Sequence, residues 1–245
     1  MKKAALITGA SDRIGKAIAM FLAQSGYAIA IHYNRSAAKA EETASLLRNT
    51  YQVECLTFQA DFNQPEQVNA LVPEIQKYMD VQVLVNNASL FYENNFPDAD
   101  DSDFDRFFAA NFRAPYALTR AIGRLKPQNR LVINMLDTDV TRNETAYFDY
   151  LLTKKFLHVF TPMAAFHLAP EVRVNAIAPG YLLPPKEDGK ITGEKGQSYL
   201  DALAAKVPLQ KQGKQEDITG ALDYFLNNEF ITGQVIFADG GMNLL

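Results

Sequence analysis

Short apolar runs alternate with longer segments of helical period along the whole chain, and this alternation restricts the fold more than any other feature. Apolar runs of strand length predict strands at residues 4–8, 27–32, 54–59, 82–85, 131–135, 173–177 and 234–238. Helices are predicted between them at 14–25, 37–49, 65–79, 102–125 (a segment that Pro115 can interrupt), 149–168 and 216–226. Strands that are apolar throughout, such as Leu131-Val132-Ile133, suit a parallel sheet covered by helices on both faces. The pattern therefore predicts an α/β doubly wound domain of the Rossmann type.

No repeat, low-complexity tract or linker divides the 245 residues, so we expect a single domain over 1–245. One segment interrupts the alternation. Between Pro179 and Pro208, glycines and prolines lie among charged residues, with a short helical stretch near 198–206. An insertion of this length, at about 180–208, is typical of a loop that borders a substrate and closes over it.

Composition excludes several classes of protein. Lys plus Arg is 24 and Asp plus Glu is 28, and a formal net charge of −4 argues against a chain built mainly to coat nucleic acid or anionic membranes. One cysteine rules out a disulfide framework, and with three histidines it cannot supply a Cys/His zinc cluster, so no metal is predicted. The apolar start is short and runs directly into Ser11-Asp12-Arg13, so we expect neither an export signal nor a membrane helix, and predict a cytoplasmic protein.

The first predicted strand ends in a glycine-bearing turn, Thr8-Gly9 to Gly15, that leads into a helix. Such a turn directs backbone N–H groups and the positive end of the helix dipole toward an anion. Gly9 and Gly15 suit a tight turn and a close approach to a pyrophosphate, whereas Arg13 stands where a middle glycine is expected. Glycine turns also join strands to helices for purely structural reasons. Its place in the first strand–helix unit of an alternating chain nevertheless indicates a dinucleotide site.

The end of the second predicted strand distinguishes between the two nicotinamide cofactors. In NAD-binding domains, an Asp or Glu about 20 residues further on accepts a hydrogen bond from the ribose 2′-hydroxyl. Residues 32–36 read His-Tyr-Asn-Arg-Ser and contain no acid. A guanidinium at Arg35, with Ser36 beside it and His32 or Arg13 nearby, suits a 2′-phosphate, although a solvated loop arginine is the alternative. The predicted cofactor is NADPH rather than NADH.

Tyr150 and Lys154 are four residues apart on one predicted helix, so both side chains project from the same face. An ammonium beside a phenol lowers the pKa of the tyrosine and makes it a usable proton donor near neutrality. Most pairs with this spacing lie on helix surfaces. This pair, however, follows a buried strand that ends in Asn134-Met135-Leu136-Asp137, which favours a catalytic interpretation.

Several motifs in this order resemble the short-chain dehydrogenase/reductase family over essentially the whole chain. The matching residues are Thr8-Gly9 to Gly15, Asp61, Asn86-Asn87-Ala88, Asn111, Tyr150 with Lys154, Arg173-Val174-Asn175, Pro179-Gly180 and Asp239-Gly240-Gly241. The resemblance implies a seven-stranded parallel sheet, a homotetramer, Tyr150 as acid/base, Lys154 on the nicotinamide ribose and a proton-relay water held by Asn111. It also implies cofactor contacts from Gly9, Arg13, Ile14, Gly15, His32, Tyr33, Asn34, Arg35, Ser36, Asp61, Phe62, Asn87, Ala88, Ser89, Tyr150, Lys154, Pro179 and Gly180.

Two residues depart from the family pattern. The family usually carries a serine where this chain has Asp137. A serine hydroxyl can donate to a substrate carbonyl, whereas an ionised carboxylate can only accept. Asp137 therefore suits a substrate rich in N–H donors, or proton delivery to a ring nitrogen through Tyr150, better than simple ketone reduction. Arg13, the second departure, could meet both a cofactor phosphate and a substrate that carries acceptors.

Both departures resemble the pteridine reductase branch, which includes dihydromonapterin reductases. The His-Tyr-x-Arg-Ser stretch and residues 86–92 resemble it as well. The resemblance implies that Phe91 stacks on a pterin opposite the nicotinamide and that Asp137 with Tyr150 relays the proton. Substrate contacts are implied for Arg13, Ser89, Phe91, Asp137, Tyr150 and Tyr181. The predicted function is NADPH-dependent reduction of a pterin or dihydropterin, with dihydrofolate among the candidates. A generic NADPH-dependent carbonyl reductase and a non-catalytic NADP-binding regulator or scaffold are the alternatives.

Other residues that could carry chemistry have simpler explanations. The acidic run at 98–105 lacks the glycine and glutamate that a calcium loop requires, so it is predicted to cap a helix. Cys55 lies in an apolar strand and is predicted to be inert core. Tyr147 has no lysine four residues on and is a poor rival to Tyr150. Phe91 has an alternative as ordinary core, because other phenylalanines lie nearby in the sequence.

Overall fold

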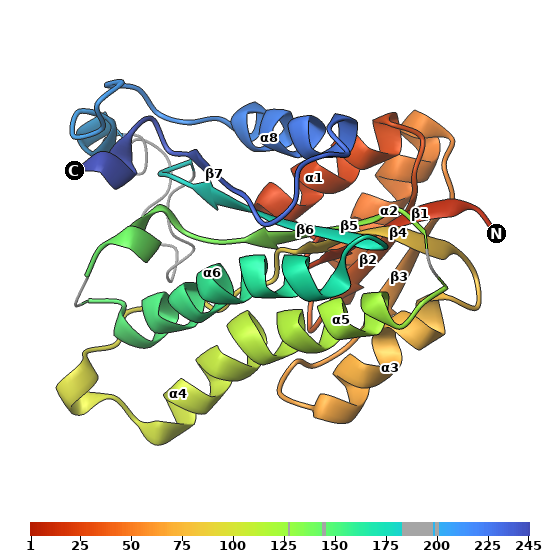
Figure 1. The fold of residues 1–245 in the computed structure, drawn as a ribbon, viewed down its shortest axis with the longest axis horizontal. Coiled ribbons are helices and arrows are strands. Elements are labelled where there is room, and N and C mark those ends of the chain that lie inside the picture. The colour runs from red at the N-terminus through yellow and green to blue at the C-terminus, as the bar shows by residue number, and fades with distance from the viewer. Residues whose placement is uncertain (127, 144–145, 183–197, 199–200) are drawn as a thin grey trace.

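The computed structural model describes residues 1–126, 128–143, 146–182, 198 and 201–245. Seven strands form one sheet: β1 (Lys3–Thr8), β2 (Ala28–Tyr33), β3 (Cys55–Gln59), β4 (Asp80–Asn86), β5 (Arg130–Met135), β6 (Val172–Pro179) and β7 (Val235–Ala238) (Figure 1). All neighbouring pairs are parallel, and the order is β3-β2-β1-β4-β5-β6-β7. This arrangement confirms the predicted α/β doubly wound fold with a seven-stranded parallel sheet.

Helices cover both faces of the sheet (Figure 1). One face is covered by α1 (Arg13–Gln24), α2 (Ala37–Tyr51) and α8 (Gln215–Asn227), and the other by α3 (Pro65–Ile75), α4 (Asp101–Phe108), α5 (Ala114–Gly123) and α6 (Phe148–Leu168). Successive strand residues point to opposite faces, so Ala5 and Ile7 join the core under α1 and α8, while Ala4 and Leu6 join the core under α3 and α5. Because both faces are buried, the central strands carry apolar residues that point to both faces.

The segment predicted as one helix over 102–125 consists of α4, a π-helical turn at Ala109–Arg113, and α5. Pro115 lies in the first turn of α5. Proline has no N–H to donate to the carbonyl four residues before it, so one α-helical hydrogen bond is missing at this point. The interruption therefore begins before the proline rather than at it. Helix α3 ends at Ile75, earlier than the predicted 79, with Pro73 in its last turn.

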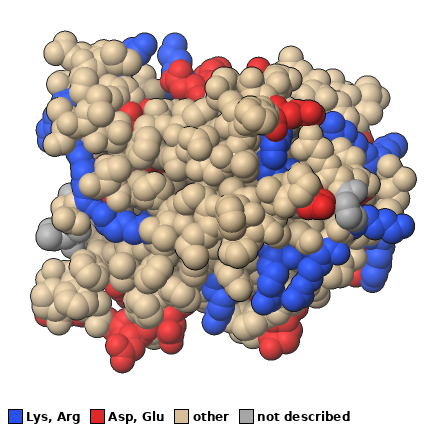
Figure 2. Space-filling view, in the orientation of Figure 1, with Lys and Arg blue, Asp and Glu red and all other residues tan. Residues whose placement is uncertain are grey.

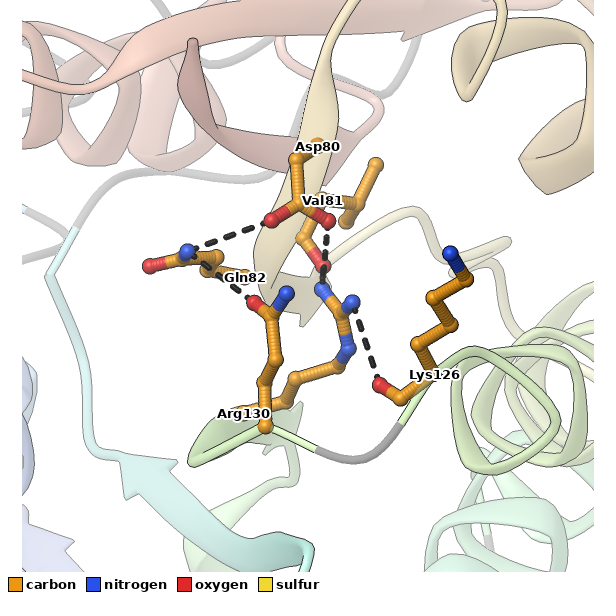
Figure 3. A network of polar contacts seen from close by, with 6 residues as sticks. Asp80, Val81, Gln82, Lys126 and Arg130 are labelled. Atoms are coloured by element: carbon orange, nitrogen blue, oxygen red, sulfur yellow. Dashed lines mark hydrogen bonds and ion pairs between the residues drawn. The ribbon is translucent and has the colours of Figure 1, made fainter. Parts of the chain in front are cut away.

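Buried arginine side chains stabilise the amino ends of the central strands. Arg130, at the start of β5, is 2% exposed. Its guanidinium donates to Asp80 Oδ1 at 2.9 Å, to the Val81 carbonyl and to the Lys126 carbonyl at 3.4 Å (Figure 3). Arg173, near the start of β6, donates to main-chain carbonyls that follow α8, including that of Asn228 at 3.2 Å. This edge is stabilised by structural ion pairs and carbonyl contacts, and the opposite edge is left for ligands.

The predicted insertion at 180–208 lies largely outside the described residues, because 183–197 and 199–200 are not among them. Within the described part, residues 201–204 are helical, in agreement with a short helix near 198–206. None of the helices in the described ranges is both long enough and apolar enough to span a lipid bilayer.

Candidate active site

A cavity of about 750 Å³ opens at the carboxyl ends of the strands, where β1 to β6 give way to loops. Parallel α/β sheets place ligand sites at this edge. The cavity is lined by every residue predicted to contact cofactor or substrate, from Gly9 in the first turn to Tyr181 after β6. Asn111 is the one predicted site residue that does not line it. The topology thus brings together residues from six separate strand ends.

The turn after β1 has the shape of a glycine turn at all three expected positions, including the one held by arginine. Gly9 has φ +66°, and a Cβ on Gly15 would lie 2.5 Å from the Gly9 carbonyl oxygen and 2.7 Å from Asn87 Nδ2. Arg13 has φ +54°, a left-handed conformation that costs a side-chain-bearing residue about 1–2 kcal/mol. The backbone therefore fits a closely approaching anion, and the Arg13 side chain is kept there at a conformational cost. Burial lowers the pKa of this guanidinium.

Thr8 joins this turn to the loop after β4. Its Oγ1 accepts hydrogen bonds from the main-chain N–H groups of Asn87 and Ala88, each at 2.9 Å. Asn87 Nδ2 also donates to the Thr8 carbonyl oxygen at 2.9 Å. The sequence motif includes Thr8, but spacing alone does not reveal that its hydroxyl accepts from two backbone N–H groups in the loop after β4.

His32, predicted to lie near the 2′-phosphate, lines the cavity with an uncharged ring. The ring is 2% exposed, and burial lowers its pKa to about 4, so the imidazole is neutral at pH 7. Nδ1 accepts from the Gly9 N–H at 3.3 Å, which leaves Nε2–H to donate to the Ala60 carbonyl at 3.0 Å. The ring stacks on Phe62 at 4.3 Å between centroids. His32 thus lines the cavity as a neutral support for the turn.

The cationic residue at the end of β2 is Arg35. It lines the cavity together with Ser36, and both are exposed. Residues 33–36 carry no carboxylate, and Asp61, after β3, is the acid that comes near, at 3.5 Å from Asn34 Nδ2. Asp61 Oδ1 also accepts from the main chain of Asn63 at 2.9 Å. The arrangement offers a guanidinium and a hydroxyl where an NAD-type site would offer a carboxylate.

Asp137 and Tyr150 form a direct pair inside the cavity. The Tyr150 hydroxyl donates to Asp137 Oδ2 at 2.7 Å. The other carboxylate oxygen, Oδ1, accepts from the main-chain N–H of Asp139 at 2.8 Å and so caps the 3₁₀ turn Thr138–Thr141. Burial, and then the negative charge of Asp137, raise the pKa of Tyr150 well above 10. The phenol is therefore held in its protonated form.

Burial and Asp137 set the Tyr150 pKa in this structure, and the lowering of that pKa by Lys154 stays a prediction. The Lys154 ammonium donates to the Met135 carbonyl at 2.8 Å and lies 5.6 Å from the centre of the Tyr150 ring. Burial lowers the pKa of Lys154 itself to about 8, which weakens its charge at higher pH. Desolvation and the adjacent carboxylate dominate over this more distant, carbonyl-bound cation.

Asn111 lies within the π-helical turn and is 1% exposed. Its Oδ1 accepts from the Leu90 main-chain N–H at 2.8 Å, and its Nδ2 donates to the Leu90 carbonyl at 3.0 Å and to Thr153 Oγ1 at 3.2 Å. Both ends of the side-chain amide are engaged within the protein. The Asn111 side chain therefore fastens the loop after β4 to α6.

Phe91 is exposed at the cavity, which argues against its alternative as ordinary core. The side chain is 40% exposed. Its ring stacks on Tyr147 at 4.6 Å and 11°, and meets Tyr150 edge to face at 4.7 Å. Sequence reasoning set Tyr147 aside because it lacks a lysine partner. Its position three residues before Tyr150 was the available signal, since that spacing puts both rings on one side of a helix.

The simpler explanations given to other residues agree with the structure. Asp100 caps α4, because its Oδ1 accepts from the Ser102 main-chain N–H at 2.8 Å. Cys55 is 1% exposed, and burial raises the pKa of its thiol to about 12. A thiol that stays protonated at neutral pH is a poor nucleophile, as expected for inert core.

Comparison with known proteins tests the family predicted from the motifs. A family model described as enoyl-(acyl carrier protein) reductase matches residues 9–243. The chain belongs to the short-chain dehydrogenase/reductase family. As a short-chain dehydrogenase/reductase it is an NAD(P)-dependent oxidoreductase.

Individual short-chain dehydrogenase/reductases match over almost the whole chain. A structure of the FolM alternative dihydrofolate reductase 1 from Brucella suis, in complex with NADP, has a TM-score of 0.90 and 35% identity, covering 99% of this chain and 95% of that one. The 3-oxoacyl-[acyl-carrier-protein] reductase FabG of Staphylococcus epidermidis is 28% identical over 99% of both chains. The acetoin dehydrogenase YohF of Salmonella typhimurium has a TM-score of 0.87 and 26% identity, covering 100% of this chain and 97% of that one. The relatives therefore agree on the class of enzyme but carry different activities.

Proposed function

We propose that this protein is an NADPH-dependent reductase of a pterin or dihydropterin, with dihydrofolate among the candidate substrates. The observation that carries the proposal is the hydrogen bond between Tyr150 and Asp137 beside the exposed ring of Phe91. A flat heteroaromatic ring binds well against an aromatic side chain when a few polar groups fix its orientation. The match to structures of alternative dihydrofolate reductases, at 35% identity, supports this substrate class.

The residues around the first turn suit a nicotinamide dinucleotide. Gly9 and Gly15 line the cavity at the amino end of α1, where backbone N–H groups and the helix dipole favour an anion such as a pyrophosphate. Arg13 would contribute a side-chain charge to the same group, and Lys154 would hold the nicotinamide ribose. When bound, the reduced nicotinamide supplies the hydride.

Proton transfer would be carried out by Tyr150 and oriented by Asp137. Tyr150 is in its protonated form at neutral pH, so it has a proton to donate to a ring nitrogen of the substrate. Asp137, as an ionised carboxylate, accepts hydrogen bonds from substrate N–H or amino groups. Phe91 would stack on the ring, with Ser89 and Tyr181 beside it in the same cavity.

The preference for NADPH rests on the end of β2. Arg35 and Ser36 would bind the 2′-phosphate. Residues 33–36 contain no carboxylate that could repel it. Two of the similar structures were solved in complex with NADP, which supports the preference.

A generic carbonyl reductase is the second candidate, because relatives named 3-oxoacyl-[acyl-carrier-protein] reductase cover the chain as fully. Asp137 separates the two candidates, since it cannot donate a hydrogen bond to a ketone. A non-catalytic NADP-binding regulator is disfavoured, because Tyr150 and Lys154 both line the cavity.

The decisive experiment measures NADPH and NADH oxidation by the purified protein with a dihydropterin, dihydrofolate and a panel of simple ketones. We expect turnover of the pterin-type substrates with NADPH and much less with NADH. Asp137→Ser should weaken pterin reduction, and Tyr150→Phe should reduce turnover by about 10²–10⁴-fold. Tyr116→Phe, which lies outside the cavity, is the matched control. Rapid ketone reduction without any pterin or folate turnover would favour the carbonyl reductase instead.

We also propose that the protein assembles as a homotetramer. Large apolar side chains are exposed along α4, α5 and α6, namely Phe104, Tyr116, Phe156, Val159, Met163 and Phe166. Figure 2 shows a broad area with neither acidic nor basic side chains across the middle of the face in view. Exposed apolar surface of this kind marks contacts between proteins. Light scattering coupled to size-exclusion chromatography measures the assembly, and a monomer at micromolar concentration would reject it.

A further inference from the structure

One cation that lines the active-site cavity has no part in the proposed function. Among the described residues, the lining includes Arg13, Arg35, Lys154 and Arg106. The first three are assigned to the cofactor, through its phosphates and the nicotinamide ribose. Arg106 comes from α4 and is left without a ligand of its own.

Arg106 lies toward the substrate end of the cavity. Its guanidinium carbon is 5.9 Å from the centre of the Tyr92 ring, and Tyr92 directly follows Phe91. The loop that carries both aromatic residues follows β4, whereas Arg35 follows β2, with β1 between the two strands. Arg106 therefore lies beside Tyr92, in the loop that also carries the ring proposed to stack on the substrate, and not beside the site proposed for the 2′-phosphate.

The partner that Arg106 holds in this structure can be exchanged at little cost. Its Nη1 lies 3.3 Å from Asp103 Oδ1, with the two side chains 54% and 30% exposed. Ion pairs as exposed as this one contribute about 0–1 kcal/mol. Asp103 also accepts from the Tyr92 hydroxyl at 2.8 Å, and burial together with this bond raises the Tyr92 pKa to about 12. Asp103 thus keeps the hydrogen bond from the Tyr92 hydroxyl when Arg106 turns to another anion.

We propose that Arg106 binds an anionic group on the side chain of the substrate, a carboxylate or a phosphate, and so selects substrates with a charged tail over neutral ones. This inference rests on the proposed pterin reductase function. The planar guanidinium donates two parallel hydrogen bonds to either group, which gives both affinity and orientation. Asp103 stays in place when the substrate binds, so Arg106 would balance charge that the anionic group adds to the site.

The test compares three substrates with wild type and Arg106→Gln. The substrates are 7,8-dihydroneopterin as the neutral reference, its phosphate ester, and dihydrofolate as the carboxylate. Arg120→Gln is the matched control, because Arg120 also lies over a tyrosine ring, at 5.5 Å from Tyr116, but does not line the cavity. Steady-state kcat and KM are measured with saturating NADPH at low and high salt.

In Arg106→Gln, we expect kcat/KM for an anionic substrate to fall about tenfold relative to the neutral reference, through KM, as for the loss of one charge-assisted contact. Salt should raise KM for that substrate in wild type and in the Arg120 variant, and much less in Arg106→Gln. Arg106→Lys should restore part of the preference. An effect on dihydrofolate alone assigns a carboxylate, and an effect on the ester alone assigns a phosphate.

Equal losses on neutral and anionic substrates, or no loss on either anionic one, would overturn the role of Arg106 while leaving pterin reduction intact. If the wild type turns over none of the three substrates, the proposed function itself fails and the role of Arg106 fails with it. Thermal unfolding of each variant separates these results from misfolding.

Discussion

The hydroxyl of Thr8 offers a direct test of how the site is held together, through Thr8→Val. Valine has nearly the same shape but replaces the oxygen with a methyl group. Oγ1 of Thr8, a residue 1% exposed, accepts from two main-chain N–H groups at 2.9 Å. The substitution would leave both donors without their acceptor, although the bond from Asn87 Nδ2 to the Thr8 carbonyl could persist.

The size of the effect follows from these contacts. An unsatisfied buried donor costs about 1–3 kcal/mol. Because Asn87 and Ala88 are themselves partly exposed, water can replace part of each bond, so the lower part of that range applies. We expect the free energy of unfolding to fall by about 2–4 kcal/mol in total. For a chain of this length, that corresponds to a lower Tm by roughly 4–16 °C.

Urea unfolding and calorimetry measure this difference, with Thr8→Ser as the control that keeps the hydroxyl. The m-value should stay constant, which would show that stability and not compactness has changed. NADPH should also bind more weakly to Thr8→Val, because both tethered segments line the cavity. If Thr8→Val unfolds at the same urea concentration as Thr8→Ser and the wild type, the hydroxyl does not join the two segments as described.

Substitutions at three further residues test charge and conformation at the site. Arg13→Gly should be more stable than Arg13→Ala by about 1 kcal/mol, because only glycine adopts a left-handed φ without strain. Both variants should bind NADPH more weakly than wild type. Equal stability of the two variants would remove the argument for strain. Arg35→Ala should weaken NADPH binding at least tenfold and NADH binding little, and calorimetric titration showing a parallel loss would contradict the 2′-phosphate assignment. Because burial lowers the pKa of Lys154 to about 8, the unfolded chain binds more protons between about pH 8 and 10, and stability should rise with pH in that window. Lys154→Met should lack this rise, and unfolding curves that keep the same pH slope in both proteins would show that Lys154 is not its source.

The fold could be predicted because the signal repeats in every strand. A central strand such as β5 is apolar at nearly every position since both of its faces are covered, and such runs at regular intervals allow few arrangements. The π-helical turn could not be predicted in the same way. Residues Ala109–Arg113 are compatible with an ordinary helix, and Pro115 marks where helical bonding must change without showing that the change precedes it.

The candidate site divides along similar lines. Residues placed by main-chain topology, such as Gly15 and Asp137, could be located because strand ends converge at one edge of the sheet. Properties that depend on burial could not be predicted. The neutral state of His32, and the direction in which the Tyr150 pKa moves, both follow from desolvation, which spacing in the sequence does not report.

The π-helical turn between α4 and α5 also affects how this part of the chain can change in length. Each residue of an α-helix advances the direction of its side chains by about 100°. Deletion of a single residue from Ala109–Arg113 could restore regular helical geometry, but would rotate α5 and turn the buried Leu118 and Ile122 away from the sheet. A substitution here would change a single side chain, whereas deletion of one residue would displace the whole buried face of α5. The number of residues in this turn thus matters more to the packing of α5 than the identity of most of them.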